Sequence, residues 1–319
     1  MFNRLSPKLK ALIALHTAVF LWGFTAILGK LITTGSLALV WQRMTITAAV
    51  YLCLPPVWKY LKNIKAKSIL TFSGIGLLVL AHWVTFYGSI KLGNSVSITL
   101  ACLGSASFFA AIIEPLLLNQ AFSKRNLLMG LAVVLGIIII YISLPASPSA
   151  TNKVQVNYTM AIITGLISAA LAATFTSLNK KYIQHEHPLT ISVIEMLSGA
   201  VLLTLYFSLT EPNLLTFPNA NISAMNLSNL STGPWDWIWI LLLSVVCTNL
   251  TFYLGTYSLK ELSAFTSNLT VNLEPIYGIV LGAIFFKENQ QLGIGFYTGA
   301  LIILSAIFTQ AYLSAKESH

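Results

Sequence analysis

Ten long apolar segments, separated by short polar breaks, constrain what this sequence can fold into. Each has about 20 residues, the length that a helix needs to cross the hydrocarbon core of a bilayer. The pattern predicts an all-α integral membrane protein with ten transmembrane helices. The segments are Leu9–Leu31, Leu37–Val57, Ile69–Ile90, Val96–Leu118, Leu127–Leu144, Tyr158–Leu178, Leu189–Leu209, Trp235–Leu259, Leu262–Phe286 and Leu292–Leu313.

The low charge content of the chain excludes an ordinary soluble protein. Only 8% of the residues are charged and 56% are hydrophobic, whereas a soluble domain carries roughly 25% charged residues. So few charges cannot cover a soluble fold of 319 residues, and most of the surface must therefore face the lipid bilayer. The net charge of +9 does not indicate a nucleic-acid partner, because the basic residues are scattered between the apolar segments.

The basic residues also assign the two sides of the membrane. If the ten segments cross in turn, 13 of the 18 Lys and Arg residues fall on the side of the N-terminus and four on the other side, with Arg43 inside a segment. Loops rich in Lys and Arg face the cytoplasm. We therefore expect a multi-pass protein of the cell (inner) membrane with both termini in the cytoplasm. The first segment is too long for the core of a cleaved signal peptide, so we expect it to remain as a helix.

No pattern in the sequence indicates a metal, a cofactor or an enzyme active site. Cys53, Cys102 and Cys247 lie far apart inside apolar segments, without the spacing of a metal site or a disulfide framework. The signature motifs of serine hydrolases, zinc proteases and P-loop ATPases are absent from the sequence. We therefore expect no metal, no cofactor and no enzymatic activity.

The two halves of the chain resemble each other weakly. Residues 1–144 and 158–319 each contain five apolar segments, and the polar stretch 145–157 separates them. Because five is odd, the second copy must be inverted in the membrane, an arrangement typical of secondary transporters. The matching residues are Phe24, Thr25 and Lys30 with Phe175, Thr176 and Lys181, then Ser89, Lys91 and Gly130 with Ser258, Lys260 and Gly299.

The C-terminal half resembles the second EamA repeat of the drug/metabolite transporter (DMT) superfamily. The residues that carry the resemblance are Leu273, Glu274 and Pro275 in the penultimate segment, Lys287 and Glu288 after it, and Gly299 in the last segment. The first half departs from this pattern, because Ser105 and Ala106 stand where the second half has Glu274 and Pro275. The resemblance implies ten helices with both termini inside, export or exchange of amino acids or other small metabolites, and a central cavity lined by both halves.

Glu274 is the leading candidate for a functional residue. It lies near the middle of the ninth segment, where a charged side chain costs roughly 2.5 to 3.5 kcal/mol on insertion scales. One interpretation is a carboxylate that takes up a proton or binds a substrate amine. The other is a hydrogen-bonded acid that bridges helices beside the Pro275 kink. Asn268, Thr270 and Asn272 add polar groups to the same segment, which predicts that this helix lies inside the bundle.

Aromatic residues and one histidine complete the candidate substrate-binding site. Trp22, Trp83, Tyr253 and Tyr257 are candidates for stacking on a planar or cationic ligand. His82 lies among aromatic residues at membrane depth. The alternative for each of these residues is packing between helices.

Three other charged residues are interpreted as structural. Arg43 lies six residues into the second segment, close enough to the membrane interface for its long side chain to reach water. Glu114 and Glu195 lie near the predicted cytoplasmic ends of their segments.

These features together predict a secondary transporter. We expect it to export or exchange small metabolites, amino acids or amines, by alternating access, driven by a proton gradient or by the gradient of the substrate. Two alternatives remain open: a carrier of lipophilic drugs or nucleotide sugars, and a membrane assembly factor without transport activity. The expected partners are a small-molecule substrate, the lipid bilayer and protons as the coupling ion.

Overall fold

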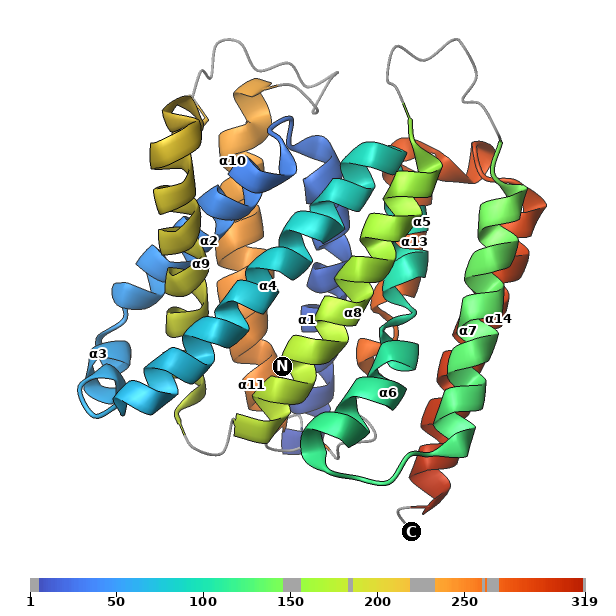
Figure 1. Ribbon diagram of the computed structural model, residues 1–319, viewed down its shortest axis with the longest axis horizontal. Helices are drawn as coiled ribbons and strands as arrows, with labels where there is room; N and C mark the ends of the chain where they lie inside the picture. Colours follow the sequence, from blue (N-terminus) through green and yellow to red (C-terminus); the bar gives the residue numbers. More distant parts are fainter. Residues whose placement is uncertain are drawn as a thin grey trace.

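The computed structural model describes residues 6–145, 156–182, 186–218, 233–259, 262 and 270–317, and these contain helices and no strands. The long helices run side by side in a bundle (Figure 1). The first half contains α1 (Pro7–Leu31), α2 (Ser36–Leu52), α3 (Pro55–Leu61), α4 (Ala66–Gly93), α5 (Val96–Leu103), α6 (Ala106–Leu118) and α7 (Lys124–Ser143). The second half contains α8 (Tyr158–Tyr182), α9 (Pro188–Thr210), α10 (Asp236–Leu241), the π-helix η6 (Leu242–Leu250), α11 (Thr251–Leu259), α13 (Glu274–Phe286) and α14 (Ile294–Glu317).

Within the described ranges, seven helical segments are long and apolar enough to cross a membrane. An eighth is added if α2 and α3, which meet at an angle of 89°, form one broken span, and Glu274–Phe286 and Ile294–Gln310 are shorter apolar helices. The predicted all-α membrane architecture is thus confirmed, and the count of ten stays a prediction.

The predicted second segment, Leu37–Val57, is not one continuous helix. α2 ends at Leu52, and Pro55 and Pro56 begin α3 in a new direction. Proline lacks the backbone N–H that continues a helix and disfavours helical geometry in the residue before it. The apolar composition of the segment therefore concealed a break that its prolines signal.

Two other predicted segments are interrupted near their middles. Between α5 and α6, the N–H of Ser105 donates to the carbonyl oxygen of Cys102 at 2.9 Å. Before α13, the N–H of Leu273 donates to the carbonyl oxygen of Thr270 at 3.0 Å. The helices α6 and α13 both have 13 residues, and a residue with a left-handed φ of 54° follows each of them, Asn119 and Lys287. The two interruptions thus have the same local geometry.

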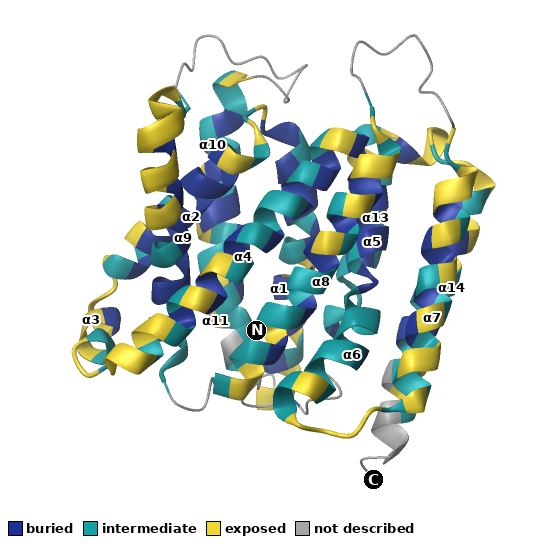
Figure 2. Ribbon diagram, in the orientation of Figure 1, coloured by how far each residue is buried: buried dark blue, intermediate teal, exposed yellow. Residues whose placement is uncertain are grey.

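Apolar side chains cover the outside of the bundle as well as its interior. Buried residues lie on the inward faces of the helices and exposed ones on the outward faces (Figure 2). On α7, Leu128, Leu135 and Ile142 follow one another at intervals of seven residues and are 58 to 73% exposed. An outer surface of this kind suits lipid and not water.

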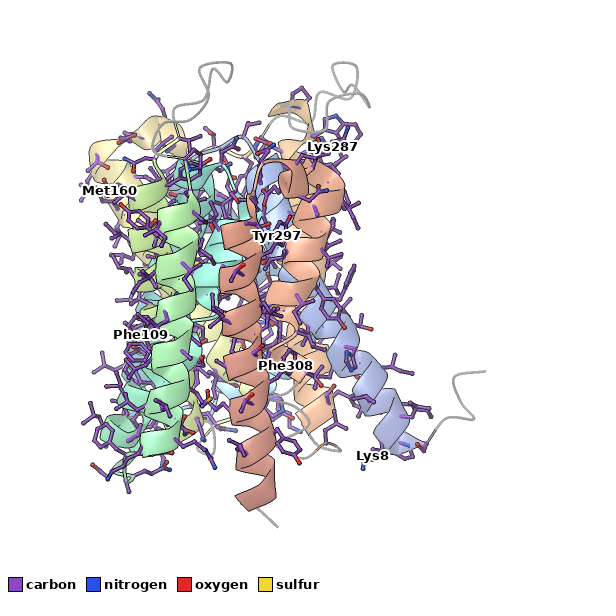
Figure 3. All side chains as sticks on the ribbon, turned by 90° about the vertical axis from the view of Figure 1, so that its right-hand side faces the viewer. Lys8, Phe109, Met160, Lys287, Tyr297 and Phe308 are labelled. Atoms are coloured by element: carbon purple, nitrogen blue, oxygen red, sulfur yellow. The ribbon has the colours of Figure 1, made fainter. Side chains whose placement is uncertain are left out.

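The bundle has two distinct ends. Lys8 and the last turns of α14 lie at one of them, called here the terminal end, and Lys287 lies at the other, called here the opposite end (Figure 3). The helices α7 and α14 pack together along one edge of the bundle (Figure 1). The remaining long helices surround the interior.

The helices α1 and α13 cross at two glycines. A Cβ atom at Gly23 would lie 3.0 Å from the backbone nitrogen of Gly278 and 3.1 Å from the carbonyl oxygen of Glu274. No larger side chain fits there unless α13 moves. The close approach therefore places the first turn of α13, which carries Glu274, against the middle of α1.

The substitution Gly23→Ala is expected to lower the thermal unfolding midpoint. The added methyl group would meet backbone atoms that cannot rotate away, and overpacking of this kind costs about 1–3 kcal/mol. The matched control is Gly74→Ala on α4, because a Cβ atom at Gly74 meets nothing within 4 Å. Thermal unfolding of the detergent-purified variants measures both effects. An unchanged midpoint for Gly23→Ala would contradict the close crossing.

Candidate functional site

A cavity of about 310 Å³ lies between the helices of the two halves. Its size falls at the low end of the range for small-molecule sites, roughly 300 to 1,000 Å³. The walls combine apolar and aromatic side chains with a few polar ones. The charged and polar lining residues are Thr25, Arg43, Tyr51, His82, Asn179, Ser192, Glu195, Thr248, Thr251 and Glu274, and the aromatic ones include Trp22, Trp83, Phe86, Phe175 and Phe252.

The cavity extends toward the terminal end of the bundle. Tyr51 lies near the end of α2, Asn179 near the end of α8 and Ser192 near the start of α9. These helix ends all lie at the terminal end (Figure 1). No lining residue lies as close to the opposite end.

Arg43 forms the cationic part of the cavity wall. It is 5% exposed, its Nη1 donates to the Tyr87 hydroxyl at 2.7 Å, and its Nε donates to Thr248 Oγ1 at 3.1 Å. The guanidinium carbon lies 3.6 Å from the centre of the Trp83 ring, a cation–π contact. These partners hold Arg43 in the interior, so it does not reach the membrane interface as the sequence suggested.

The π-helix η6 positions the partner of Arg43. Within it, the Thr248 hydroxyl donates to the carbonyl oxygen of Leu243, five residues earlier, at 2.8 Å. π-helical turns are rare and occur frequently at functional sites. One turn further, Trp22 Nε1 of α1 donates to Thr251 Oγ1 at 3.0 Å. This stretch therefore ties α1 and α2 together at the cavity.

Glu274 brings a carboxyl group to the same cavity. It is the first residue of α13 and lines the cavity together with Arg43. Within the described part of the chain, its carboxyl has no hydrogen-bond or ion-pair partner, since the two ion pairs there are Lys30 with Glu288 and Lys180 with Glu114. Glu274 is thus available to a ligand or a proton.

Glu195 is a second cavity carboxyl, which the sequence had suggested to be structural. It is 6% exposed on α9, and its Oε1 atom has no hydrogen-bond partner among the described residues. Asn179 of α8 lies beside it in the cavity wall, and the Oδ1 atom of Asn179 is also buried, with no partner in the part of the chain that the structure describes. The sequence did contain a signal for this residue, because Glu195 is an acid inside an apolar segment. Its position in the segment did not show that its side chain faces the cavity.

His82 lies in the cavity wall and is tied to α8. Its Nδ1 atom lies 2.9 Å from both the carbonyl oxygen and the Oγ of Ser168. Its ring lies 5.4 Å from the ring of Phe175. The hydrogen bonds to α8 use the Nδ1 side of the imidazole, so only the Nε2 side remains for a ligand.

The structure gathers some of the other predicted site residues and separates the rest. Trp22 and Trp83 line the cavity. Tyr253 is 64% exposed on the outside of the bundle, and Tyr257 packs against the apolar cluster of Ala11, Leu15 and Val19. Thr270 is buried and Asn272 lies in the turn before α13, both outside the cavity lining, and Asn268 lies outside the described residues.

A largely buried ion pair lies near the opposite end of the bundle, beside Lys287 (Figure 3). Glu288 is 1% exposed and pairs with Lys30 at 2.9 Å, and Lys30 also donates to the carbonyl oxygen of Asn94 at 2.5 Å. The same carboxylate accepts hydrogen bonds at 2.9 to 3.1 Å from the chain at the start of α5: the Ser95 hydroxyl and the N–H groups of Val96 and Ser97. Burial alone raises the pKa of the Glu288 carboxyl, but Lys30 and these hydrogen bonds outweigh it, so the pKa lies below its ordinary value.

The terminal end has weaker polar contacts in the described part of the chain. Glu114 and Lys180 form an ion pair whose side chains are 30% and 62% exposed. Lys181 donates to the carbonyl oxygen of Leu117 at 2.9 Å and is exposed. Exposed pairs of this kind contribute little to stability.

The chain is similar to known proteins in both sequence and fold. Residues 159–310 match the EamA-like transporter family. "Uncharacterized transporter YetK" from Bacillus subtilis (strain 168) is 24% identical over 328 residues, which cover 97% of this chain and 92% of that protein. A solved crystal structure of a protein superposes with a TM-score of 0.60 at 13% identity, over 97% of this chain and 99% of that chain. This likeness extends over the whole fold.

Proposed function

Because the chain is an EamA-type protein of the DMT superfamily and a membrane transporter, we propose that it moves small metabolites through the central cavity by alternating access. The single observation that carries this proposal is the cavity itself, which is lined by Arg43, by aromatic side chains and by Glu195 and Glu274, two carboxyls without an ion-pair partner among the described residues. Unpaired charged groups at membrane depth are costly and mark substrate or ion pathways.

The chemistry of the lining favours amino acids or amines as cargo. A purely apolar drug would give the carboxyls of Glu195 and Glu274 no partner, which is unfavourable in a site of low polarity. A nucleotide sugar carries several negative charges, and Arg43 is the one Lys or Arg in the described lining. A small molecule with an ammonium group, a carboxylate or both matches the charges of the wall.

We propose that residues 1–144 and 158–319 are inverted repeats, an arrangement that suits an alternating mechanism. The contacts between the halves come in related pairs. α4 packs on α8, and in the corresponding contact η6 and α11 pack on α1. α6 also packs on α8, and in the corresponding contact α13 packs on α1. The interruptions before α6 and α13 have the same geometry at positions 168 residues apart. Interrupted helices at corresponding places of two halves are typical of the binding sites of secondary transporters.

The two ends of the bundle differ in a way that suits one state of such a cycle. The buried network of Glu288 and Lys30 closes the opposite end, and the cavity extends toward the terminal end, where the polar contacts are exposed. With both termini in the cytoplasm, as the basic residues predict, this state would open inward. The symmetry-related state would require the Glu288 network to open.

Transport is tested with proteoliposomes loaded with a mixture of amino acids, amines and other metabolites. Selective loss of a few compounds, measured by mass spectrometry against empty liposomes, would support the proposal and name the cargo. No loss under any imposed pH gradient would favour the assembly-factor alternative.

The substitution Glu274→Gln is expected to remove the pH dependence of transport. Glu274 is a cavity carboxyl on an interrupted helix, where protonation can be coupled to binding, and glutamine keeps its shape without titrating. The measurement is the initial rate of release at a series of pH values, with the unfolding midpoint as a check of folding. The control is Glu114→Gln, whose carboxyl pairs with Lys180 away from the cavity. A pH profile like that of the wild type would overturn the coupling role.

A further inference from the structure

We propose that Glu195 and Asn179 form an ammonium-binding site at the end of the cavity nearest the terminal end, and this inference rests on the proposed transport function. The ligand is a primary ammonium group, carried by an amine or by a zwitterion. Glu274 of α13 lines the same cavity, and Glu195 of α9 adds a second carboxyl to its wall.

The first argument is the unsatisfied state of the two side chains. Glu195 is 94% buried, yet its Oε1 atom has no donor in the described part of the protein. The Oδ1 atom of its neighbour Asn179 is buried and lacks a donor as well. Buried acceptors without donors are costly, and both residues line the cavity. A cavity ligand that donates to both oxygens would satisfy them together.

The second argument is that the protein supplies no cation of its own. Among the described residues, neither ion pair includes Glu195. Arg43 is the cation of the cavity wall, and it is already held by Tyr87, Thr248 and Trp83. When the Glu195 carboxyl is ionised, the described part of the protein therefore offers it no balancing charge, and a cation in the cavity can supply one.

The third argument concerns the kind of cation. An ammonium group has three N–H donors and no acceptor, which matches a carboxylate beside an amide oxygen. Phe175 and Phe252 also line the cavity, and aromatic rings attract organic ammonium ions. Calcium needs six or more oxygen ligands, and no group of three or more His, Cys, Asp or Glu side chains suited to a metal occurs in the described ranges.

Other titratable groups around the cavity set the polarity of the site. They come from several elements: Arg43 and Tyr51 of α2, His82 of α4, Cys247 of η6 and Glu274 of α13. Arg43 is the only one of these with a permanent positive charge. The cavity thus has a cationic part at Arg43 and an anionic part at Glu195, and a zwitterion can bind to both.

The test uses three probes that share one aromatic ring. Phenethylamine carries only the ammonium group, N-acetylphenylalanine carries only the carboxylate, and phenylalanine carries both. Binding to the purified full-length protein is measured by the change in tryptophan fluorescence, because Trp22 and Trp83 line the cavity. The variants are Glu195→Gln and Asn179→Ala, with Glu114→Gln as the control.

We expect Glu195→Gln to weaken the binding of phenethylamine and phenylalanine by about tenfold or more, the effect of losing one hydrogen bond to a charged group. Binding of N-acetylphenylalanine should stay unchanged, and Asn179→Ala should show the same selectivity with a smaller loss. Glu114→Gln should bind all three probes like the wild type.

An equal loss for all three probes would overturn the site, because it would show a structural role. Unchanged binding of phenethylamine by Glu195→Gln, or a wild-type protein that binds no ammonium probe, would also overturn it. The proposed function is judged separately by the proteoliposome assay. Transport that continues at the wild-type rate in Glu195→Gln would reject the ammonium site and leave the carrier function standing. If a variant fails to fold, Glu195→Asp replaces it and should keep the preference for ammonium probes.

Discussion

The substitution Glu288→Ala is expected to destabilise the protein by about 3–5 kcal/mol, the usual cost of removing one partner from a buried ion pair. The carboxylate of Glu288 is 1% exposed and holds Lys30 together with three donors at the start of α5. Without it, the ammonium group of Lys30 stays buried and lacks its counter-charge. The measurement is the unfolding midpoint in detergent.

The exposed pair at the terminal end supplies the control for this prediction. Glu114→Ala removes a carboxylate from a pair that is partly in water, so we expect a change of about 0–1 kcal/mol. An equally small effect for Glu288→Ala would contradict the buried network.

The pH dependence of unfolding gives a second readout for Glu288. Because its pKa is lowered by folding, its contribution to stability is fully present above the ordinary value of 4.5 and is lost as the pH falls through the lower pKa of the folded state. The wild type should therefore lose stability below about pH 4.5 more steeply than Glu288→Ala. Parallel curves for the two proteins would contradict the assigned pKa direction.

The sequence predicted the continuous helices well because each depends on a local pattern. Apolar runs of sufficient length became α1, α4, α7, α8 and α9 with boundaries close to those expected. The break between α5 and α6 has no strong local signal, since Gly104 and Ser105 occur in ordinary helices too. The break before α13 does have one, because Pro275 stands in the first turn of that helix and lacks the backbone N–H that would continue a preceding helix.

The candidate site was partly predictable for the same reason. Glu274 stood out as an acid in the middle of an apolar segment, and it does line the cavity. The partners of Arg43 come from residues 44 and 205 positions away in the chain, so no local pattern pointed to them. The aromatic candidates were only partly right: Trp22 and Trp83 line the cavity, whereas Tyr253 is 64% exposed. A residue type that packs between helices as readily as it binds ligands does not reveal which of the two it does.

The substitution Arg43→Ala is expected to reduce transport on the order of 100-fold, the effect of losing about 2.7 kcal/mol of charged hydrogen bonding. A guanidinium group has five N–H donors. The Tyr87 hydroxyl accepts a hydrogen bond from Nη1, and Thr248 Oγ1 accepts the one that Nε can donate. Among the described residues Nη2 has no partner, so its donors are free for an anionic group of the substrate. The measurement is the initial rate of transport in proteoliposomes.

Arg43→Lys should restore little of this activity. The variant keeps the positive charge but not the planar guanidinium, so it shows which of the two transport requires. A single lysine Nζ cannot donate to both Tyr87 and Thr248 and also present a planar face to Trp83, where the guanidinium carbon lies 3.6 Å from the ring centre. Lys67→Gln removes one positive charge from an exposed position and should leave transport unchanged. If Arg43→Lys transports within a few fold of the wild type, a positive charge is sufficient at this position. The planar, pre-oriented guanidinium would then not be what selects the substrate.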